Sequence, residues 1–200
     1  GDLSAGVLQV AIVAPGGAVT WKRVPDPAAT TSPTREQVPD ATRFQRGEGI
    51  WFDKGYVYLA TTRDSRLWAY NTRRRRIRVL YDPERLAKPP LTDVDNVTVH
   101  KPSGDLYVCE DNGGADAYDV GVVTFSRGPR GRRRRPVVSR FAKLTGAEHG
   151  DPGSEAASEV AGVCFNPSGD RMYFASQRAF GVGVVYEVTG PFRRLPGRAG

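Results

Sequence analysis

Residues 49–62 read GIWFDKGYVYLATT, and this stretch decides the predicted fold. Two short runs rich in apolar and aromatic residues flank a turn that contains Gly55, which predicts a β-hairpin. The pattern occurs twice more, as NVTVHKPSGDLYVCED at 96–111 and as GVCFNPSGDRMYFASQ at 162–177. In both of these copies a Pro-Ser-Gly turn supplies a fixed φ, followed by a glycine that is free to adopt a positive φ.

Further strand-like segments follow these hairpins. A third strand is predicted in RLWAYNT, GVVTFSR and GVVYEVTG, a fourth in RIRVLYD and VVSRFAKL, and one more hairpin in GVLQVAIVAPGGAVTWKRVP near the N-terminus. About four short antiparallel strands in each repeat of roughly 50 residues are typical of a β-propeller. The sequence therefore predicts an all-β fold, with three to four propeller blades in a single domain over residues 1–200.

The number of predicted blades is small for a propeller. Propellers usually close with about four to eight blades, so we expect this chain to be part of a larger propeller whose N-terminal blades are missing. Open first and last blades would leave unpaired strand edges, which favour pairing with another chain. Self-association through these edges is therefore expected.

The composition is that of a globular protein with a net charge of +7. No apolar run reaches the roughly 18 residues that a membrane-spanning helix needs. Two runs of four arginines, at 73–76 and 132–135, fall in a predicted hairpin turn and in a Gly/Pro-rich loop, where solvated turns are expected. A polyanion-binding surface is the alternative, although nucleic acid is not expected as a partner because no basic and aromatic recognition motif accompanies the runs.

The cysteines and histidines give no catalytic pattern. Cys109 and Cys164 each lie in an apolar run, which predicts two buried free thiols, with one disulfide as the alternative. Two cysteines are too few for a cysteine-rich metal site. His100 lies beside a predicted hairpin turn and His149 in a loop, and both are expected at the surface.

Each repeat has an acidic residue just before its first strand. These residues are Glu48, Asp95 and Glu159. In a propeller the first strands line the central channel, so these carboxylates would converge at one mouth, together with the polar residues that end the second strands at 63–64, 110–112 and 177–178. Converging carboxylates repel one another unless a cation binds among them, and hard oxygen ligands suit Ca²⁺ or an oxophilic transition ion. The alternative is that the acids are turn caps and strand gatekeepers.

The same segments resemble a known family. The words GEGIWFDKGYVYLATT, DNVTVHKPSGDLYVCED, SEVAGVCFNPSGDRMYFASQ and VVYEVTGPFR occur in family order over most of residues 44–194. They resemble the PhoX-type alkaline phosphatases and their bacterial relatives of unassigned function. The resemblance implies a β-propeller, a periplasmic or extracellular location, and a calcium- and iron-dependent site that hydrolyses phosphomonoesters at the channel mouth.

The resemblance also implies roles for particular residues. Glu48 and Glu159 match metal-ligand glutamates of the family, Arg46 matches an arginine that contacts phosphate, and Asp95 falls near a further family acid. The weaker candidates are Asn96, Glu110 and Asn112, because DVDNV and CEDNG depart from the family wording. The family's cysteine-bearing metal segment has no match here, so the chain resembles the C-terminal half of a member.

Two functions remain open from the sequence. The first is a metal-dependent phosphatase, or a fragment of one, in which metal ions polarise the phosphoryl group and Arg46 stabilises the developing charge. The second is a non-catalytic propeller that binds a cation or a protein partner.

Overall fold

The structure, a computed structural model, describes residues 5–111, 119–125, 136–150 and 158–195. Within these residues the chain is all-β, with thirteen strands in four antiparallel sheets. Helical structure in the described ranges is confined to short 3-10 turns at Thr34–Glu36, Pro83–Arg85, Ala147–His149 and Ala179–Gly181. None of the described helices is long and apolar enough to cross a membrane.

Strands that are consecutive in the chain pair with one another in every sheet. The first sheet has two strands, β1 (Gln9–Val13) and β2 (Val19–Arg23). The second has four, β3 (Gly47–Asp53), β4 (Tyr56–Thr61), β5 (Arg66–Asn71) and β6 (Arg76–Tyr81). The third has β7 (Val94–His100), β8 (Asp105–Glu110), β9 (Val120–Thr124) and β10 (Val137–Ala142), and the fourth has β11 (Val160–Phe165), β12 (Arg171–Ser176) and β13 (Val184–Thr189).

The three hairpins predicted from the repeat are confirmed as β3–β4, β7–β8 and β11–β12. Their turn glycines Gly55, Gly104 and Gly169 have φ values of 81°, 74° and 69°. A side chain with a Cβ rarely adopts this left-handed region, so glycine is the residue that each turn requires.

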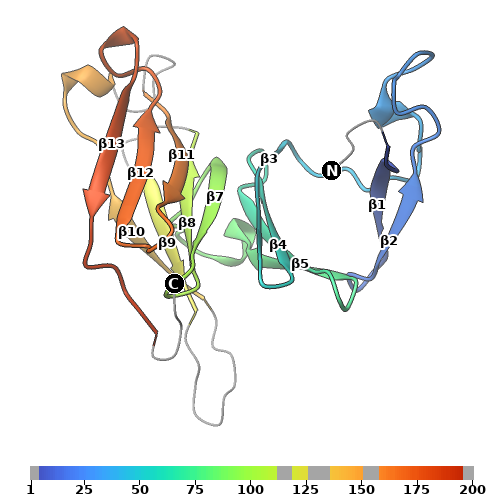
Figure 1. Cartoon of the computed structure of the whole chain (residues 1–200), viewed down its shortest axis with the longest axis horizontal. Coiled ribbons are helices and arrows are strands. Elements are labelled where there is room, and N and C mark those ends of the chain that lie inside the picture. Colours follow the sequence, from blue (N-terminus) through green and yellow to red (C-terminus); the bar gives the residue numbers. More distant parts are fainter. Residues whose placement is uncertain (1–4, 112–118, 126–135, 151–157, 196–200) are drawn as a thin grey trace.

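The sheets follow one another along an open arc in chain order (Figure 1). The first strands of the last three sheets are neighbours, because β7 contacts both β3 and β11. At the two ends of the arc, β1–β2 and β13 stand apart, and the described strands form no closed sheet.

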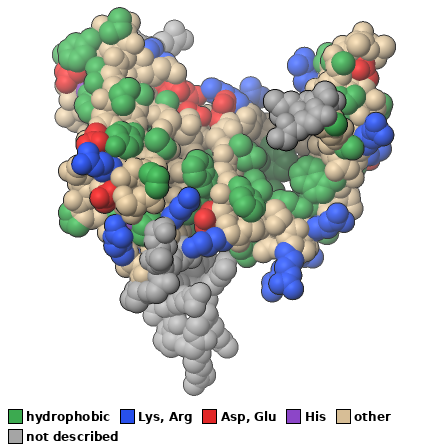
Figure 2. Space-filling model, viewed as in Figure 1, with side chains coloured by type: hydrophobic (Ala, Val, Ile, Leu, Met, Phe, Trp, Pro, Cys, Tyr) green, Lys and Arg blue, Asp and Glu red, His purple; other side chains and the backbone are tan. Residues whose placement is uncertain are grey.

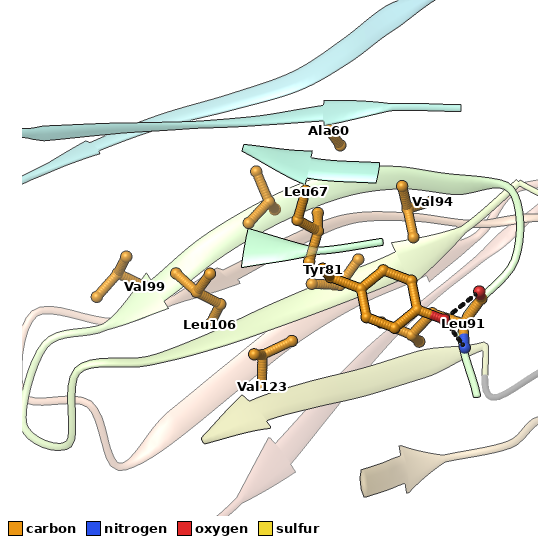
Figure 3. Packing of buried hydrophobic residues seen from close by; sticks show 10 residues of the cluster. Ala60, Leu67, Tyr81, Leu91, Val94, Val99, Leu106 and Val123 are labelled. Carbon is orange, nitrogen blue, oxygen red and sulfur yellow. Dashed lines mark hydrogen bonds between the residues drawn. The ribbon is translucent and has the colours of Figure 1, made fainter. Parts of the chain in front are cut away.

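Two apolar cores lie between successive sheets. The first joins sheet β3–β6 to sheet β7–β10 (Figure 3), and the second joins sheet β7–β10 to sheet β11–β13. In the first core the Tyr81 hydroxyl donates to the carbonyl of Leu91 at 2.7 Å and accepts from its N–H at 3.0 Å. This pair satisfies the backbone of the β6–β7 loop where the loop enters the core, as a buried peptide group requires.

Three expectations about cysteine and histidine were wrong. Cys109 is a buried free thiol as predicted, but Cys164 is exposed. His100 and His149 are both buried rather than at the surface. His100 lies at the end of β7, where its Nε2 is 2.8 Å from the carbonyl of Gly169 and its Nδ1 is 2.8 Å from the Ser103 hydroxyl. The ring of His100 is buried against the turn at Gly169, which belongs to the next sheet. Because Gly169 is far from His100 in the sequence, local sequence patterns do not predict this contact.

Candidate functional site

The charged side chains at the starts of the first strands meet in one place. We call this group the charged cluster. It contains Arg46, Glu48, Asp95, Asp111, Glu159 and Arg178. Three of the four sheets contribute, since the members belong to the β3–β4, β7–β8 and β11–β12 hairpins or to the residues next to them. In Figure 2 acidic side chains gather on one side of the molecule, near the upper junction between the sheets.

Gly49 explains how Glu48 approaches Asp95. A Cβ atom on Gly49 would lie 2.5 Å from the carbonyl oxygen of Asp95 and 2.7 Å from the backbone nitrogen of Val97. Real Cβ atoms do not approach backbone so closely, so only glycine lets β3 lie this near to β7. The glycine after Glu48 thus brings the two acids of neighbouring sheets together.

The acids at 48 and 95 occupy the same place in their strands. β3 has a bulge between Gly47 and Ile50, and β7 has one between Val94 and Val97. Glu48 and Asp95 are each the first residue inside these bulges. A bulge adds a residue and re-aims side chains, which is a common device beside functional sites.

Glu159 has a different register from Glu48 and Asp95. Its carbonyl accepts the N–H of Gln177 at 2.8 Å, as the carbonyl of Arg46 accepts the N–H of Thr62 at 2.9 Å. Glu159 therefore corresponds in position to Arg46. The sequence comparison placed the three acids in equivalent positions, and this holds for only two of them, because the bulge of β11 lies further along its strand, between Ala161 and Cys164.

Two arginines pair with the acids of the charged cluster. Arg46 binds Glu48 at 2.9 Å and Asp111 at 2.7 Å, so one guanidinium links two sheets. Arg178 binds Glu159 at 3.3 Å. The Asp111 carboxylate raises the pKa of Arg46 further above its usual value, with a smaller contribution from Glu48, so this side chain stays charged.

Two of the carboxyl groups experience repulsion that the arginines do not remove. Burial raises the pKa of Asp95, and the charges of Glu48 and Asp111 raise it further. Burial also raises the pKa of Glu159, and a hydrogen bond and charge from Asp111 add to that rise. The Asn96 amide donates to Asp95 at 2.6 Å, and this hydrogen bond partly offsets the rise in the pKa of Asp95. The charged cluster is therefore a place where a further cation would lower the electrostatic energy.

The weaker candidates have separate surroundings. Asn96 lies in the β7 bulge and contacts Asp95. Glu110 is fully buried, and its carboxylate accepts from the N–H of Thr92 at 2.6 Å and from the N–H of Asp119 at 3.0 Å. These bonds hold the loop that leads into β7 and the residue that precedes β9, both at the open end of the β7–β8 hairpin. Asn112 lies outside the described residues.

The sequence candidates did not include Asp111 and Arg178. Both lie just beyond second strands, in the polar segments expected at the mouth. Asp111 follows β8, and its N–H bonds to the carbonyl of Asp93 at 2.8 Å, which extends the hairpin by one residue. Adjacent residues of a strand point to opposite faces of the sheet, so Glu110 and Asp111 cannot both face the charged cluster. Sequence reasoning that applied this alternation at the end of β8 would have named Asp111 as the site residue instead of Glu110.

The donor chemistry of the charged cluster fits calcium, because its ligating atoms are carboxylate oxygens. Within the part of the chain that the structure describes, however, no three Asp, Glu, His or Cys side chains are arranged to hold a metal ion. Three of the four carboxylates, those of Glu48, Asp111 and Glu159, lie instead as partners of Arg46 and Arg178, and the Asp95 carboxylate accepts from the Asn96 amide. No protein-family model and no curated protein with which the sequence was compared matches it.

Proposed function

We propose that this chain is part of a β-propeller protein similar to the PhoX-type phosphatases, and that the charged cluster is its cation- and phosphate-binding region. One observation carries the proposal. Four carboxylates and two guanidinium groups from three successive sheets meet at the starts of the first strands. A propeller explains why first strands of separate sheets would share one end.

The residues of the charged cluster suit binding of a phosphomonoester. Carboxylate oxygens of Glu48, Asp95 and Glu159 are ligands that a hard cation prefers. A cation bound there would polarise a phosphoryl oxygen and lower the pKa of a bound water. Arg46 carries a planar fork of donors that can bind two phosphate oxygens, and its exposed side chain can exchange a carboxylate for phosphate. Calcium is the ion we propose first, with iron implied only by the family resemblance, as is a periplasmic or extracellular location.

A non-catalytic propeller that binds a cation or a protein partner is the second candidate. The ion pairs of Arg46 and Arg178 favour it, because they already neutralise part of the carboxylate charge. In this alternative the charged cluster fastens neighbouring sheets together and has no substrate.

Binding of calcium and inorganic phosphate separates the two candidates. We expect calorimetry of the full 200-residue chain to detect weak Ca²⁺ binding, because a Ca²⁺ site needs about six to eight oxygens. Phosphate should then bind only when Ca²⁺ is present, and Arg46→Gln should abolish this binding. Glu48→Gln should weaken Ca²⁺ binding several-fold, whereas Asp40→Asn, an exposed acid that pairs with Lys22, should leave it unchanged.

Each result favours one candidate. Calcium binding without calcium-dependent phosphate binding would support the non-catalytic propeller. No calcium binding at millimolar concentration would exclude the proposed cation region. Because the chain resembles only half of a family member, we expect it to hydrolyse p-nitrophenyl phosphate slowly. Glu48→Gln should therefore barely change that rate. Rapid metal-dependent turnover by a monomer would contradict the expectation of a partial propeller.

A further inference from the structure

Two hairpin turns join into one surface at the end of the molecule opposite the charged cluster. We call this surface the double-turn tip. It consists of residues 14–18, between β1 and β2, and of residues 72–76, which are the β5–β6 turn and the first residue of β6. The N–H of Val19 donates to the carbonyl of Arg75, and the N–H of Ile77 donates to the carbonyl of Gly17, both at 2.8 Å. The Arg76 guanidinium also donates to the carbonyl of Gly16.

Close packing keeps these two turns in a fixed relation. A Cβ atom on Gly17 would lie 2.2 Å from the carbonyl oxygen of Ile77, so glycine is needed where the turns touch. Asn71 accepts the N–H of Arg74 at 2.7 Å and thereby closes the β5–β6 turn. The double-turn tip is therefore ordered before any ligand arrives, which lowers the entropic cost of binding.

The double-turn tip presents unpaired positive charge. Arg73, Arg74 and Arg75 are exposed, and among the described residues none of the three has an acidic partner within ion-pair distance. Arg75 has a φ of 48°, a conformation in which glycine or asparagine would be less strained. Exposed Lys54 lies in the adjacent turn, which Thr72 joins through its N–H to the carbonyl of Gly55 at 3.0 Å.

Apolar and aromatic groups accompany the arginines. Ala14, Pro15 and Ala18 are exposed in the β1–β2 turn. Trp21 is 43% exposed, packs edge-on against Tyr70 and donates from Nε1 to the Tyr70 hydroxyl at 3.0 Å. Arginine beside Trp and Tyr is a combination that suits the interface of a lipid bilayer. Arginine is attracted to anionic headgroups, and the amphipathic rings of Trp and Tyr lie at the level of the headgroups.

Charge is separated along the strands. The charged cluster lies where β3, β7 and β11 begin, and the β5–β6 turn lies at the other end of its sheet. Lys and Arg side chains project from the lower right edge of the molecule in Figure 2, where Figure 1 places the turns next to β5 and β2. The acids of the charged cluster would thus point away from an anionic surface that the double-turn tip approaches.

We propose that the double-turn tip binds the surface of a bilayer that contains anionic phospholipids. A projecting turn with three clustered arginines can gather mobile phosphate headgroups around itself. Nucleic acid, in contrast, is bound by many phosphate contacts along a groove or by a row of stacking platforms. This proposal does not depend on the proposed phosphatase function.

Vesicle co-sedimentation of the full chain tests the proposal. We expect binding to vesicles of phosphatidylcholine with 30 mol% phosphatidylglycerol (about one lipid in three, as a test of surface charge) and none to phosphatidylcholine alone. The triple variant Arg73→Ser, Arg74→Ser, Arg75→Gly should bind roughly 100-fold more weakly, since each basic side chain near such a surface contributes about fivefold. Glycine at position 75 relieves the positive φ, so this variant should fold.

A charge-matched control places the effect at the double-turn tip. Arg43, Arg63 and Lys88 are exposed and lie in segments at the other end of the sheets. Changing all three to Ser removes the same charge but should leave vesicle binding within about twofold, while Trp21→Ala should weaken it several-fold. Equal loss in both triple variants, equal binding to the two kinds of vesicle, or binding of a DNA duplex in place of anionic vesicles would each overturn the proposal.

Discussion

Sheets β3–β6 and β7–β10 have the same apolar pattern on one face but very different surroundings. Ile50 and Phe52 of β3 have the same register as Val97 and Val99 of β7, because the bulge precedes both pairs. Val97 and Val99 are only 5% and 3% exposed, packed against sheet β3–β6. Ile50 and Phe52 are 64% and 63% exposed.

The second strands of the two sheets differ in burial in the same way. Leu106 and Val108 are fully buried on the covered face, whereas Val57 and Leu59 on the matching face of the other sheet are only half-buried. Figure 2 shows hydrophobic side chains in the hollow between sheet β3–β6 and hairpin β1–β2. Each repeat therefore has an apolar face suited to packing against the preceding sheet. In sheet β7–β10 this face is covered, and in sheet β3–β6 the described residues leave it largely exposed. An uncovered apolar face of this kind favours association.

The largest loss of stability is expected when a Cβ atom is added at Gly49, where β3 and β7 are in close contact. Gly49→Ala would place a Cβ atom against the backbone of Asp95 and Val97, which would push β3 away from β7 and open the first core. We expect the free energy of unfolding to fall by about 3 kcal/mol, measured by urea denaturation. In Gly47→Ala the nearest contact is a flexible side-chain atom, Leu59 Cδ1 at 3.7 Å, so the change should be less than about 1 kcal/mol. Equal losses would mean that close contact between the strands is unimportant.

The next effect compares the two matched faces directly. Val99→Ala creates a cavity in a covered face and should lower the free energy of unfolding by roughly 2 kcal/mol. Phe52→Ala removes a larger side chain from an open face and should change it by no more than about 0.5 kcal/mol. Urea denaturation at two protein concentrations checks both values. A concentration-dependent loss in Phe52→Ala would reveal that another copy of the chain covers this face.

The smallest effect concerns the acids where these sheets meet. Burial and neighbouring acids raise the pKa of Asp95, so the folded state binds its proton more tightly than the unfolded state does. The stability that this group contributes is therefore present in acid and is lost as the pH rises through the raised pKa. Asp95→Asn should increase the free energy of unfolding at pH 7 by up to about 1 kcal/mol, and the gain should shrink towards pH 4.

Asp26 provides a control of opposite sign. Its hydrogen bond from the Thr30 hydroxyl is the main cause that lowers the pKa of Asp26. Asp26→Asn should therefore reduce stability at neutral pH, and the difference should disappear in acid. Chemical denaturation at pH 7 and pH 4 measures Asp95→Asn, and a further measurement at a pH below the lowered pKa of Asp26 completes the comparison for Asp26→Asn. A loss of stability in Asp95→Asn at pH 7 would show that the attraction of Asp95 to Arg46 and its hydrogen bond from Asn96 outweigh the burial and repulsion.

The sequence by itself determined the local elements. Apolar alternation and the turn glycines gave the three hairpins, because a hairpin is fixed by residues that are close together in the chain. The same local rules predicted Glu48 and Asp95 just before their strands, and the structure corrects this by a small shift, because each acid is the second residue of its strand, β3 or β7. They also indicated that the arginines at 73–76 form an exposed turn. All four are exposed, and 73–75 lie in the turn, while Arg76 is the first residue of β6. The second arginine run, 132–135, lies outside the described residues.

Only the tertiary structure decided which side chains meet. Arg46 pairs with Asp111 across two sheets, and Gly49 sets the distance between those sheets, yet neither contact leaves a local pattern in the sequence. His100 was expected at the surface and is buried, because its partner Gly169 belongs to another hairpin. Contacts between distant segments depend on how whole sheets pack, and the energy that selects one packing is spread over many buried side chains instead of residing in any one motif.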